Sequence, residues 1–377
     1  MRRVLADTNA SRAQPPRAVV DYEELASCWS PGYRYAARVS SDDERLGVEA
    51  LSAAGLDVVW VESPDIRSGD VISLSPQARS CTVLFRAADH HHALFLTNRC
   101  NSYCLMCSQP PTTVDDGWLV EEAIEVVRHV LDPPAVLGIT GGEPTLLGSD
   151  LARVTRTINE KFPVTRVEIL TNARLLGSSA LARELLEAIP SARTTWLVPL
   201  YGHADFLHDF VVQAPGAFEQ TVAGLLHLQQ YGHAIQLRTV LIEPVLQELP
   251  ALSEFVARNL PFVREVALMA PEPIGFALAN RDLCAVDLND WHDTLRAGAR
   301  TLQRYGIPFM FMNVPLCALP HDLKPYAQRS ISDWKNTYAP ECNGCDVRSD
   351  CCGLFTWYER GWRPAKLVPI KLLEASL

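Results

Sequence analysis

The feature that most restricts the fold of this chain is a regular alternation of short apolar runs and amphipathic stretches from Ala93 onward. ALFLT (93–97) and AVLGIT (135–140) predict strands, whereas apolar residues at three- and four-residue intervals in WLVEEAIEVVRHVL (118–131) predict a helix. Six such β–α units precede about residue 270. Apolar strands separated by helices indicate a parallel sheet covered by helices. Doubly wound sheets and β/α barrels share this alternation, and both place ligands at the carboxyl ends of their strands.

The two ends of the chain depart from this pattern. Residues 1–90 carry the short strand-like runs LDVVWVES, DVISLS and CTVLFRA after a potential helix at 41–54, and we expect a small α+β or mainly β domain there. Beyond about residue 313, Pro, Asn and Cys accumulate and the alternation stops. The sequence thus predicts three parts, which are an N-terminal domain at 1–90, an α/β core at 91–312 and a cysteine-rich extension at 313–377.

Composition describes an ordinary folded protein, with 48% hydrophobic and 21% charged residues among 377. The net charge of −10 argues against a nucleic-acid partner. No apolar run is long enough to span a membrane, and the start of the chain lacks the apolar segment of a secretory signal. The odd total of 11 cysteines opposes a secreted disulfide framework. We therefore expect a cytoplasmic protein whose clustered thiols bind metal, with Cys28, Cys81 and Cys284 as isolated side chains.

The first thiol cluster lies in LTNRCNSYCLMCSQPP (96–111), where Cys100, Cys104 and Cys107 form a CxxxCxxC array in the loop after the first core strand. A loop can wrap three thiolates around one centre, whereas a regular helix would point at least one of them away. A structural zinc site would want four protein ligands. A cubane [4Fe–4S] cluster is also normally held by four thiolates. When three hold it, one iron stays open to an external ligand, so the array predicts such an open cluster.

With these residues in place, the sequence resembles the radical S-adenosylmethionine (SAM) superfamily. Its signature is CxxxCxxC after the first strand with an aromatic residue, here Tyr103, directly before the second cysteine. A second mark is TGGEPTL (140–146) at the end of the second strand. In that family the GGEP backbone and carboxylate hold the amino group of SAM. The resemblance gives this role to Gly141, Gly142 and Glu143, and Pro144 shapes the loop.

The resemblance also implies a fold and a chemistry. The fold is an α/β partial (β/α)6-type TIM-like barrel over roughly 91–312. An open iron chelates SAM, and one-electron transfer from the reduced cluster breaks a carbon–sulfur bond to give a 5′-deoxyadenosyl radical. An electron donor such as flavodoxin or ferredoxin is implied.

Further SAM contacts are expected at the strand ends. Thr171 and Asn172 end the third strand of the barrel, so we expect them near its mouth. Arg238 in the fifth strand could meet the SAM carboxylate or face solvent. The polar residues of the run at 203–209 either contact the substrate or cap the next helix.

The second thiol cluster lies in YAPECNGCDVRSDCCGLFTWY, which supplies Cys342 and Cys345 and then Cys351 or Cys352. Cys317 in NVPLCALP is the expected fourth ligand. Spacing alone favours structural zinc. The resemblance favours an auxiliary [4Fe–4S] cluster, because many radical SAM enzymes carry one in such an extension. Since adjacent cysteines do not both suit one cluster, we expect Cys351 to be the ligand and Cys352 a spare thiol or an alternate ligand.

Several stretches narrow the resemblance to the C-type maturase of the His-Xaa-Ser peptide-modification system: RCNSYCLMCSQPP, ITGGEPTLL, VPLYGHADFLHDFVVQAPGAFEQT, LCALP and SISDWKNTYAPECNGC. The match runs over most of residues 85–353. It implies modification of a small His-Xaa-Ser-repeat peptide, with a second radical SAM protein as a partner. Two alternatives stay open, namely a radical SAM enzyme acting on a small molecule or RNA, and a non-catalytic protein with two zinc sites.

Overall fold

The structure is a computed structural model that describes residues 2–10 and 14–372. Its residues form two compact units, and each is described by itself. Unit 1 consists of residues 1–96, 116–138 and 149–167, and unit 2 consists of residues 97–115, 139–148 and 168–377. The three-part division drawn from the sequence stays a prediction.

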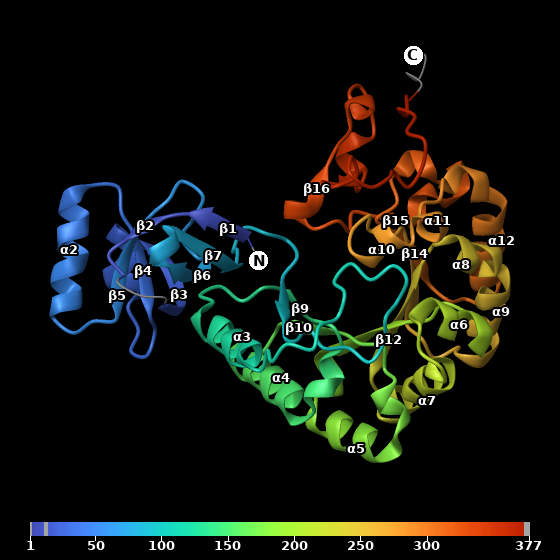
Figure 1. Cartoon of the computed structure of the whole chain (residues 1–377), viewed down its shortest axis with the longest axis horizontal. Coiled ribbons are helices and arrows are strands. Elements are labelled where there is room, and N and C mark those ends of the chain that lie inside the picture. The colour runs from blue at the N-terminus through green and yellow to red at the C-terminus, as the bar shows by residue number, and fades with distance from the viewer. Residues whose placement is uncertain (1, 11–13, 373–377) are drawn as a thin grey trace. The chain divides into compact units, whose positions relative to one another are not determined.

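A seven-stranded sheet fills the N-terminal part of unit 1 (Figure 1). Its strands lie in the order β1 (Arg2–Leu5), β7 (Ser80–Phe85), β6 (Val71–Ser75), β3 (Gln14–Asp21), β4 (Tyr35–Arg38), β5 (Val58–Glu62) and β2 (Asp7–Thr8). Successive residues of β3 enter different apolar clusters, because Val19 packs with Ala36 while Val20 packs with Tyr35. Both faces of this sheet are therefore buried. The predicted helix is α2 (Asp42–Ala53), which begins after Ser41.

The core sheet has eight strands that lie side by side in chain order. They are β8 (Ala93–Phe95), β9 (Val136–Thr140), β10 (Arg166–Leu170), β11 (Thr194–Pro199), β12 (Ala234–Val240), β13 (Glu265–Met269), β14 (Phe309–Met312) and β15 (Ala327–Gln328). Neighbouring strands from β11 to β15 pair in parallel. The predicted fold class is confirmed, since a parallel α/β sheet of this kind is the core of a partial TIM-like barrel.

Helices alternate with the strands along the chain (Figure 1). They are α3 (Trp118–His129), α4 (Ser149–Lys161), α5 (Ser179–Ala188), α6 (Asp205–Val212), α7 (Ala217–Gln230), α8 (Glu243–Gln247), α9 (Leu249–Asn259) and α12 (His292–Arg304). Trp196 and Phe311 on one face of the sheet are fully buried, whereas Arg238, Glu265 and Met310 on the other face are partly exposed. The face that carries Arg238 and Glu265, here called the inner face, is thus the less buried of the two.

The C-terminal extension belongs to unit 2 and is mostly irregular. The short strands β16 (Asn336–Thr337) and β17 (Leu354–Phe355) pair antiparallel, and between them the chain runs through 3₁₀ turns and loops. Two other short helices, α10 (Phe276–Ala279) and α11 (Arg281–Cys284), precede α12. Small apolar clusters pack around Phe355 and Tyr358. A segment with so little regular structure needs other bonds to hold its shape.

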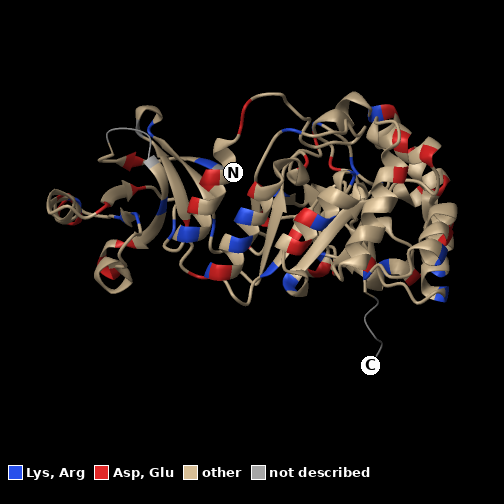
Figure 2. Cartoon of the chain, turned by 90° about the horizontal axis from the view of Figure 1, so that it is seen from below, with Lys and Arg blue, Asp and Glu red and all other residues tan. Residues whose placement is uncertain are grey.

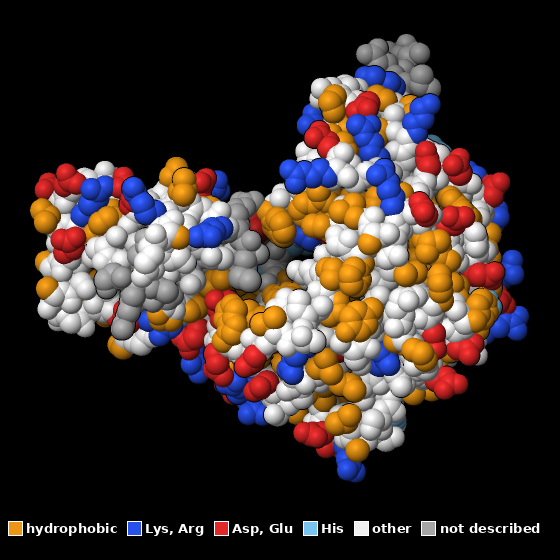
Figure 3. Space-filling model, viewed as in Figure 1, with side chains coloured by type: hydrophobic (Ala, Val, Ile, Leu, Met, Phe, Trp, Pro, Cys, Tyr) orange, Lys and Arg blue, Asp and Glu red, His pale blue; other side chains and the backbone are white. Residues whose placement is uncertain are grey.

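Charged residues of both signs are interspersed along the elements (Figure 2). Lys and Arg side chains gather over the C-terminal extension at the top of Figure 3. Residues 313–372 contain eight Lys and Arg against six Asp and Glu, whereas the whole chain carries −10. Among the described residues, no helix combines the length and apolar character needed to cross a membrane.

Candidate functional site

The three-cysteine array lies in the loop between β8 and α3, and main-chain hydrogen bonds fix this loop on two sides. The N–H groups of Tyr103 and Leu105 donate to carbonyl oxygens in the last turn of α6 at 3.0 and 2.9 Å. The carbonyl of Cys107 accepts the N–H of Phe276 at 2.9 Å. Because these bonds involve backbone atoms, they hold the loop whatever its side chains bind.

The thiols of the array share an apolar environment and lie close enough to influence one another. Burial raises the pKa of Cys104 to about 12, and the neighbouring Cys107 and Cys100 add to this rise. Burial also raises the pKa of Cys100 to about 11 and that of Cys107 in the same direction. Thiols of this kind stay protonated at neutral pH unless a cation displaces their protons. Within residues 2–10 and 14–372, no group of three His, Cys, Asp or Glu side chains is arranged to hold a single metal ion.

The glycine pair after β9 packs directly on the backbone that leads into Cys100. The N–H of Gly142 donates to the Thr97 carbonyl at 2.7 Å, and the N–H of Glu143 donates to the Arg99 carbonyl at 2.8 Å. A Cβ on Gly142 would lie 2.2 Å from the Arg99 oxygen, and one on Gly141 would lie 2.6 Å from the Thr97 oxygen. Only glycine permits this approach, so the two loops form one backbone cradle.

Glu143 occupies a fully buried position in this cradle, and its carboxylate binds groups of the chain itself. Its Oε1 accepts from the Thr145 N–H at 3.0 Å and from the Thr145 and Thr171 hydroxyls, each at 2.6 Å. Its Oε2 accepts one bond, from the Asn172 N–H at 2.6 Å. Burial raises the Glu143 pKa, and these donors oppose the rise. The carboxylate thus ties the end of β9 to the end of β10 and keeps one acceptor position on Oε2.

The end of β10 also contacts the cysteine loop. The Asn172 side-chain amide donates to the Asn101 side-chain oxygen at 2.6 Å. Arg174 donates to the Asn101 carbonyl and to the Ser102 hydroxyl, the latter at 3.0 Å. The sequence prediction included Asn172 but missed Arg174. The available signal in the sequence was the position of Arg174 directly after the strand-end residues 171–173. Arg174 opposes the rise in the Cys104 pKa electrostatically.

Arg238 lies on the inner face of the sheet, so the outward alternative raised by the sequence does not hold. Its Nε donates to the Gln236 side-chain oxygen at 2.9 Å, and the Gln236 amide donates to Glu265 at 2.7 Å. Burial lowers the Arg238 pKa, and the carboxylates of Glu168 and Glu265 oppose this. Burial raises the pKa of Tyr201, Cys104 and Cys107 add to this rise, and Arg238 opposes it. Contact of Arg238 with a ligand stays a prediction.

The polar run after β11 supports neighbouring structure. The Asp209 carboxylate accepts the N–H groups of Gly216 and Phe218 at 2.6 and 2.8 Å, which caps the start of α7. His208 is buried, and its Nδ1 accepts the Tyr201 N–H at 3.2 Å. Burial lowers the His208 pKa to about 4, so this imidazole is neutral at pH 7.

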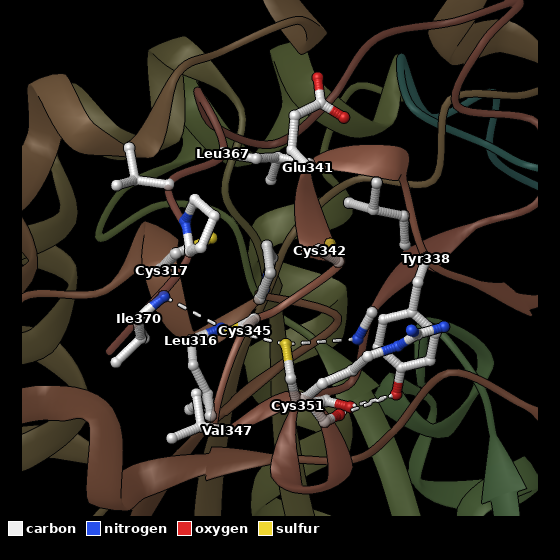
Figure 4. Close-up of a pocket in the computed structure, with 16 residues that line it drawn as sticks. Leu316, Cys317, Tyr338, Glu341, Cys342, Cys345, Val347, Cys351, Leu367 and Ile370 are labelled. Atoms are coloured by element: carbon white, nitrogen blue, oxygen red, sulfur yellow. Dashed lines mark hydrogen bonds between the residues drawn. The ribbon is translucent and has the colours of Figure 1, made fainter. Parts of the chain in front are cut away.

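A pocket in unit 2 brings together Cys317, Cys342, Cys345 and Cys351 (Figure 4). The four cysteines come from separate turns, and apolar side chains, among them Leu367, fill the wall between them. Electrostatic coupling joins Cys342 to both Cys345 and Cys351, and Cys317 to both Cys342 and Cys351. These are the four residues that the sequence named for the second cluster.

Amide groups already point at two of these sulfurs. Cys351 Sγ accepts the N–H groups of Leu316 and Gly353 at 3.4 and 3.5 Å, and Cys345 Sγ accepts that of Ile370 at 3.4 Å. The Cys352 side chain and these amides lower the Cys351 pKa to about 6 against the effect of burial. Cys352 itself is 4% exposed and packs in an apolar cluster with Phe355. The two thiols differ, because the hydrogen bond between them favours a thiolate at Cys351 and, together with burial, raises the pKa of Cys352.

Comparisons with known proteins match one family pattern and one curated relative. The pattern of the radical SAM superfamily matches residues 94–255. An AdoMet-dependent heme synthase of Methanosarcina barkeri (strain Fusaro / DSM 804) is 30% identical over 161 residues, which cover 41% of this chain and 43% of that protein. The chain thus spans less than half the length of this curated relative.

Two solved structures show a more distant likeness. SuiB of Streptococcus suis bound to precursor peptide SuiA is 14% identical, with a TM-score of 0.45 over 59% of this chain and 48% of that one. A radical SAM methyltransferase from Sphaerobacter thermophilus is 17% identical, with a TM-score of 0.44 over 78% of this chain and 84% of that one.

Proposed function

We propose that this chain, whose residues 94–255 match the pattern of the radical SAM superfamily, cleaves SAM reductively to modify a ribosomally made peptide. The observation that carries the first half is the joint cradle of the cysteine loop and the Gly141–Gly142 backbone. There the loop that carries the three thiols lies directly against the glycine backbone. The peptide substrate rests on the sequence resemblance to the His-Xaa-Ser maturases.

In this proposal Cys100, Cys104 and Cys107 hold a [4Fe–4S] cluster with one open iron. When bound, the cluster and SAM supply the electron transfer and carbon–sulfur cleavage that yield a 5′-deoxyadenosyl radical. The residues fit such a group, because their buried thiols need a cation in order to ionise. The chain itself positions the loop, partly shields the thiols from water and leaves the fourth ligand position to SAM.

The neighbouring groups are proposed to orient SAM. Carbonyls of Gly141 and Gly142 and the spare acceptor on Glu143 Oε2 suit the SAM ammonium group. Pro144 begins the short turn in which Glu143 accepts the N–H of Thr145. The Thr171–Asn172 strand end fixes the Glu143 carboxylate rather than SAM directly. Arg238 keeps its terminal nitrogens for a carboxylate, because Gln236 binds only its Nε.

We further propose that the pocket of Cys317, Cys342, Cys345 and Cys351 holds an auxiliary [4Fe–4S] cluster. Four thiols around one pocket, three amide bonds to sulfur and an apolar wall suit an anionic cluster away from water. With four protein thiolates, no iron stays open for a substrate. A zinc ion could use the same four ligands, and metal analysis distinguishes the two.

The partners follow from the same proposal. A small His-Xaa-Ser-repeat peptide is the substrate, and a second radical SAM protein acts with this chain. Reduction of the cluster requires an electron donor such as flavodoxin or ferredoxin. The excess of Lys and Arg over residues 313–372 (Figure 3) favours docking of a negatively charged donor on this extension.

Peptide docking is proposed at an edge of the N-terminal sheet. Among the described strands, β1 lies at the end of the sheet and pairs with β7 alone, and its Leu5 is 76% exposed. An edge strand can receive an extended peptide as an added strand. Deleting residues 1–85 would be a coarse test, because it also removes Arg34 and Tyr33, which pair with side chains of α3 and α4. Val4→Pro is the sharper test, because it alters the edge strand without removing the domain. We expect loss of peptide binding with unchanged SAM cleavage. Unchanged peptide binding would contradict edge docking.

The heme synthase relative favours a second candidate, namely action on a small molecule. Incubation of the reduced enzyme and SAM with peptide and metabolite pools separates the two. Mass spectrometry of the His-Xaa-Ser peptide after co-expression with this chain and its partner is the direct test. An unmodified peptide together with a consumed metabolite would favour the second candidate.

The core proposal is tested on anaerobically reconstituted protein. Wild type should be brown from sulfur-to-iron charge transfer and should release 5′-deoxyadenosine from SAM after chemical reduction. Cys104→Ala should release none. Cys28→Ala, which changes an isolated thiol, is the matched control and should behave as wild type. Colourless protein, or equal product from the Cys104 variant, would contradict the assignment.

A further inference from the structure

The segment Arg363–Leu372, here called the C-terminal strap, crosses the pocket of the second cysteine cluster. It contains no helix or strand. Leu367 and Ile370 nevertheless line the pocket, and Figure 4 shows both beside the cysteines. Val368 in its middle is 58% exposed, so apolar burial alone does not hold the strap in place. Ala365 is buried and Leu367 packs against the cluster around Tyr358, and polar bonds add to this packing.

Those bonds involve the cysteine segment itself. The Ile370 carbonyl accepts the Asp346 N–H at 3.0 Å, and the Ile370 N–H donates to Cys345 Sγ at 3.4 Å. One residue thus makes both bonds of a strand-like pair, with a sulfur in the place of a carbonyl oxygen. The Asp346 carboxylate accepts the N–H of Leu372 at 2.9 Å, which fixes the strap just beyond this pair.

Hydrogen bonds also fix the other end of the strap. The Asp287 carboxylate accepts the Lys366 N–H at 3.1 Å, and the Pro364 carbonyl accepts the Leu288 N–H at 2.9 Å. The Lys366 carbonyl accepts the Asn289 amide at 3.2 Å. Anchors on both sides of Ile370 keep its N–H aimed at the sulfur, because the strap cannot slide along the pocket.

We propose that the C-terminal strap sets the reduction potential of the auxiliary cluster through the Ile370 N–H. This inference rests on the proposed cluster at Cys345 and its three companions. A hydrogen bond to a ligating sulfur stabilises the more negative, reduced form, and such bonds are a main determinant of iron–sulfur potentials. Removal of this donor therefore lowers the midpoint potential. Ile370 is a positioning residue that acts through its backbone and not through its side chain.

The test uses the full chain with Cys104→Ala, so that the auxiliary cluster is the only paramagnetic centre. Ile370→Pro removes the N–H, and Ile370→Ala keeps it while removing most of the side chain. Midpoint potentials come from redox titration followed by electron paramagnetic resonance, with iron content measured in each sample. We expect a more negative potential for the Pro variant than for the Ala variant at equal iron content. Equal potentials overturn the inference.

Hydrogen exchange supplies a second measurement that needs no variant of the strap. Amide exchange of residues 364–372 is followed by mass spectrometry in cluster-loaded and cluster-free protein. Slower exchange at Ile370 after loading is expected, and equal exchange overturns the inference even when the Pro variant does not hold iron. A Cys104→Ala chain that binds no iron at all would instead refute the auxiliary cluster and, with it, the premise of the strap.

Discussion

Gly142→Ala should separate the two loops that form the cradle. Its added Cβ would lie 2.2 Å from the Arg99 carbonyl oxygen and 2.6 Å from the Arg99 carbonyl carbon. Ordinary contact begins at 3.4 Å, so the Arg99 backbone must move by about 1.2 Å. Neither partner is a flexible side-chain end, and Arg99 directly precedes Cys100. The strain therefore passes into the cluster loop.

The expected size of the effect follows from this displacement. Overpacking of this kind costs about 1–3 kcal/mol of stability. A misplacement of about 1 Å in a reacting arrangement costs on the order of 10²-fold in rate. We therefore expect a modest loss in the free energy of unfolding and a SAM cleavage rate lower by about two orders of magnitude.

The assay compares 5′-deoxyadenosine release, SAM affinity and iron content in reduced, reconstituted protein. Gly232→Ala is the matched control, because its φ of +73° strains an alanine but no atom lies within 4 Å of the added Cβ. It should lose about 1 kcal/mol of stability and keep wild-type cleavage. Wild-type cleavage by the Gly142 variant would refute the view that close loop approach shapes the SAM site.

Three further substitutions test other parts of the structure. Glu143→Gln should leave at least one buried donor among its four without an acceptor and cost about 1–3 kcal/mol in urea unfolding; a stability equal to wild type would contradict this. For His208 the folded pKa of about 4 lies below the ordinary 6.5, so the unfolded state binds more protons in this window and stability falls as pH is lowered through it. His208 contributes about 2 kcal/mol to the change in stability between pH 8 and pH 5. His208→Gln keeps an acceptor for the Tyr201 N–H and should remove that part of the pH dependence of the free energy of unfolding. An unchanged pH dependence would count against a neutral buried imidazole. Cys345→Ala should lower iron content by about half while Cys352→Ala leaves it unchanged, and equal iron in wild type and the Cys345 variant would defeat the auxiliary cluster.

The sequence predicted the core well because its signals are local and repeated. Helix α3 was expected at 118–131 and occupies Trp118–His129, and β9 was expected at 135–140 and occupies Val136–Thr140. In such units the apolar spacing that makes a helix amphipathic also fixes its place on the sheet. The N-terminal domain was harder, and β3 and β4 had no counterpart among the predicted strands. QPPRAVVD contains two prolines, which argue against a central strand, although it pairs on both sides.

The candidate site was predictable in its residues and not in its bonds. Spacing identified Glu143, but nothing in GGEP indicates that its carboxylate would bind Thr171 and the Asn172 N–H. Arg238 lies in an apolar run, and its inward direction follows only from strand register. Such contacts depend on which strand ends become neighbours in the folded chain, and local sequence patterns do not contain that information. Arg174 escaped prediction for the same reason, since its partner Asn101 is 73 residues away.

The two cysteine sites differ most clearly in the number of thiols that the chain provides. At the first, the chain offers three sulfurs beside the glycine cradle, and the proposed cluster there leaves one iron for an added ligand. At the second, it offers four sulfurs, amides that donate to two of them and the strap over the pocket, and the proposed cluster there has protein ligands on all four irons. An open iron suits binding and bond cleavage, whereas a closed one suits electron exchange at a fixed potential. The division predicts that added SAM changes the magnetic resonance spectrum of the first cluster and leaves that of the second, isolated in Cys104→Ala, unaltered. A SAM-dependent change in that variant would show that the second site is open after all.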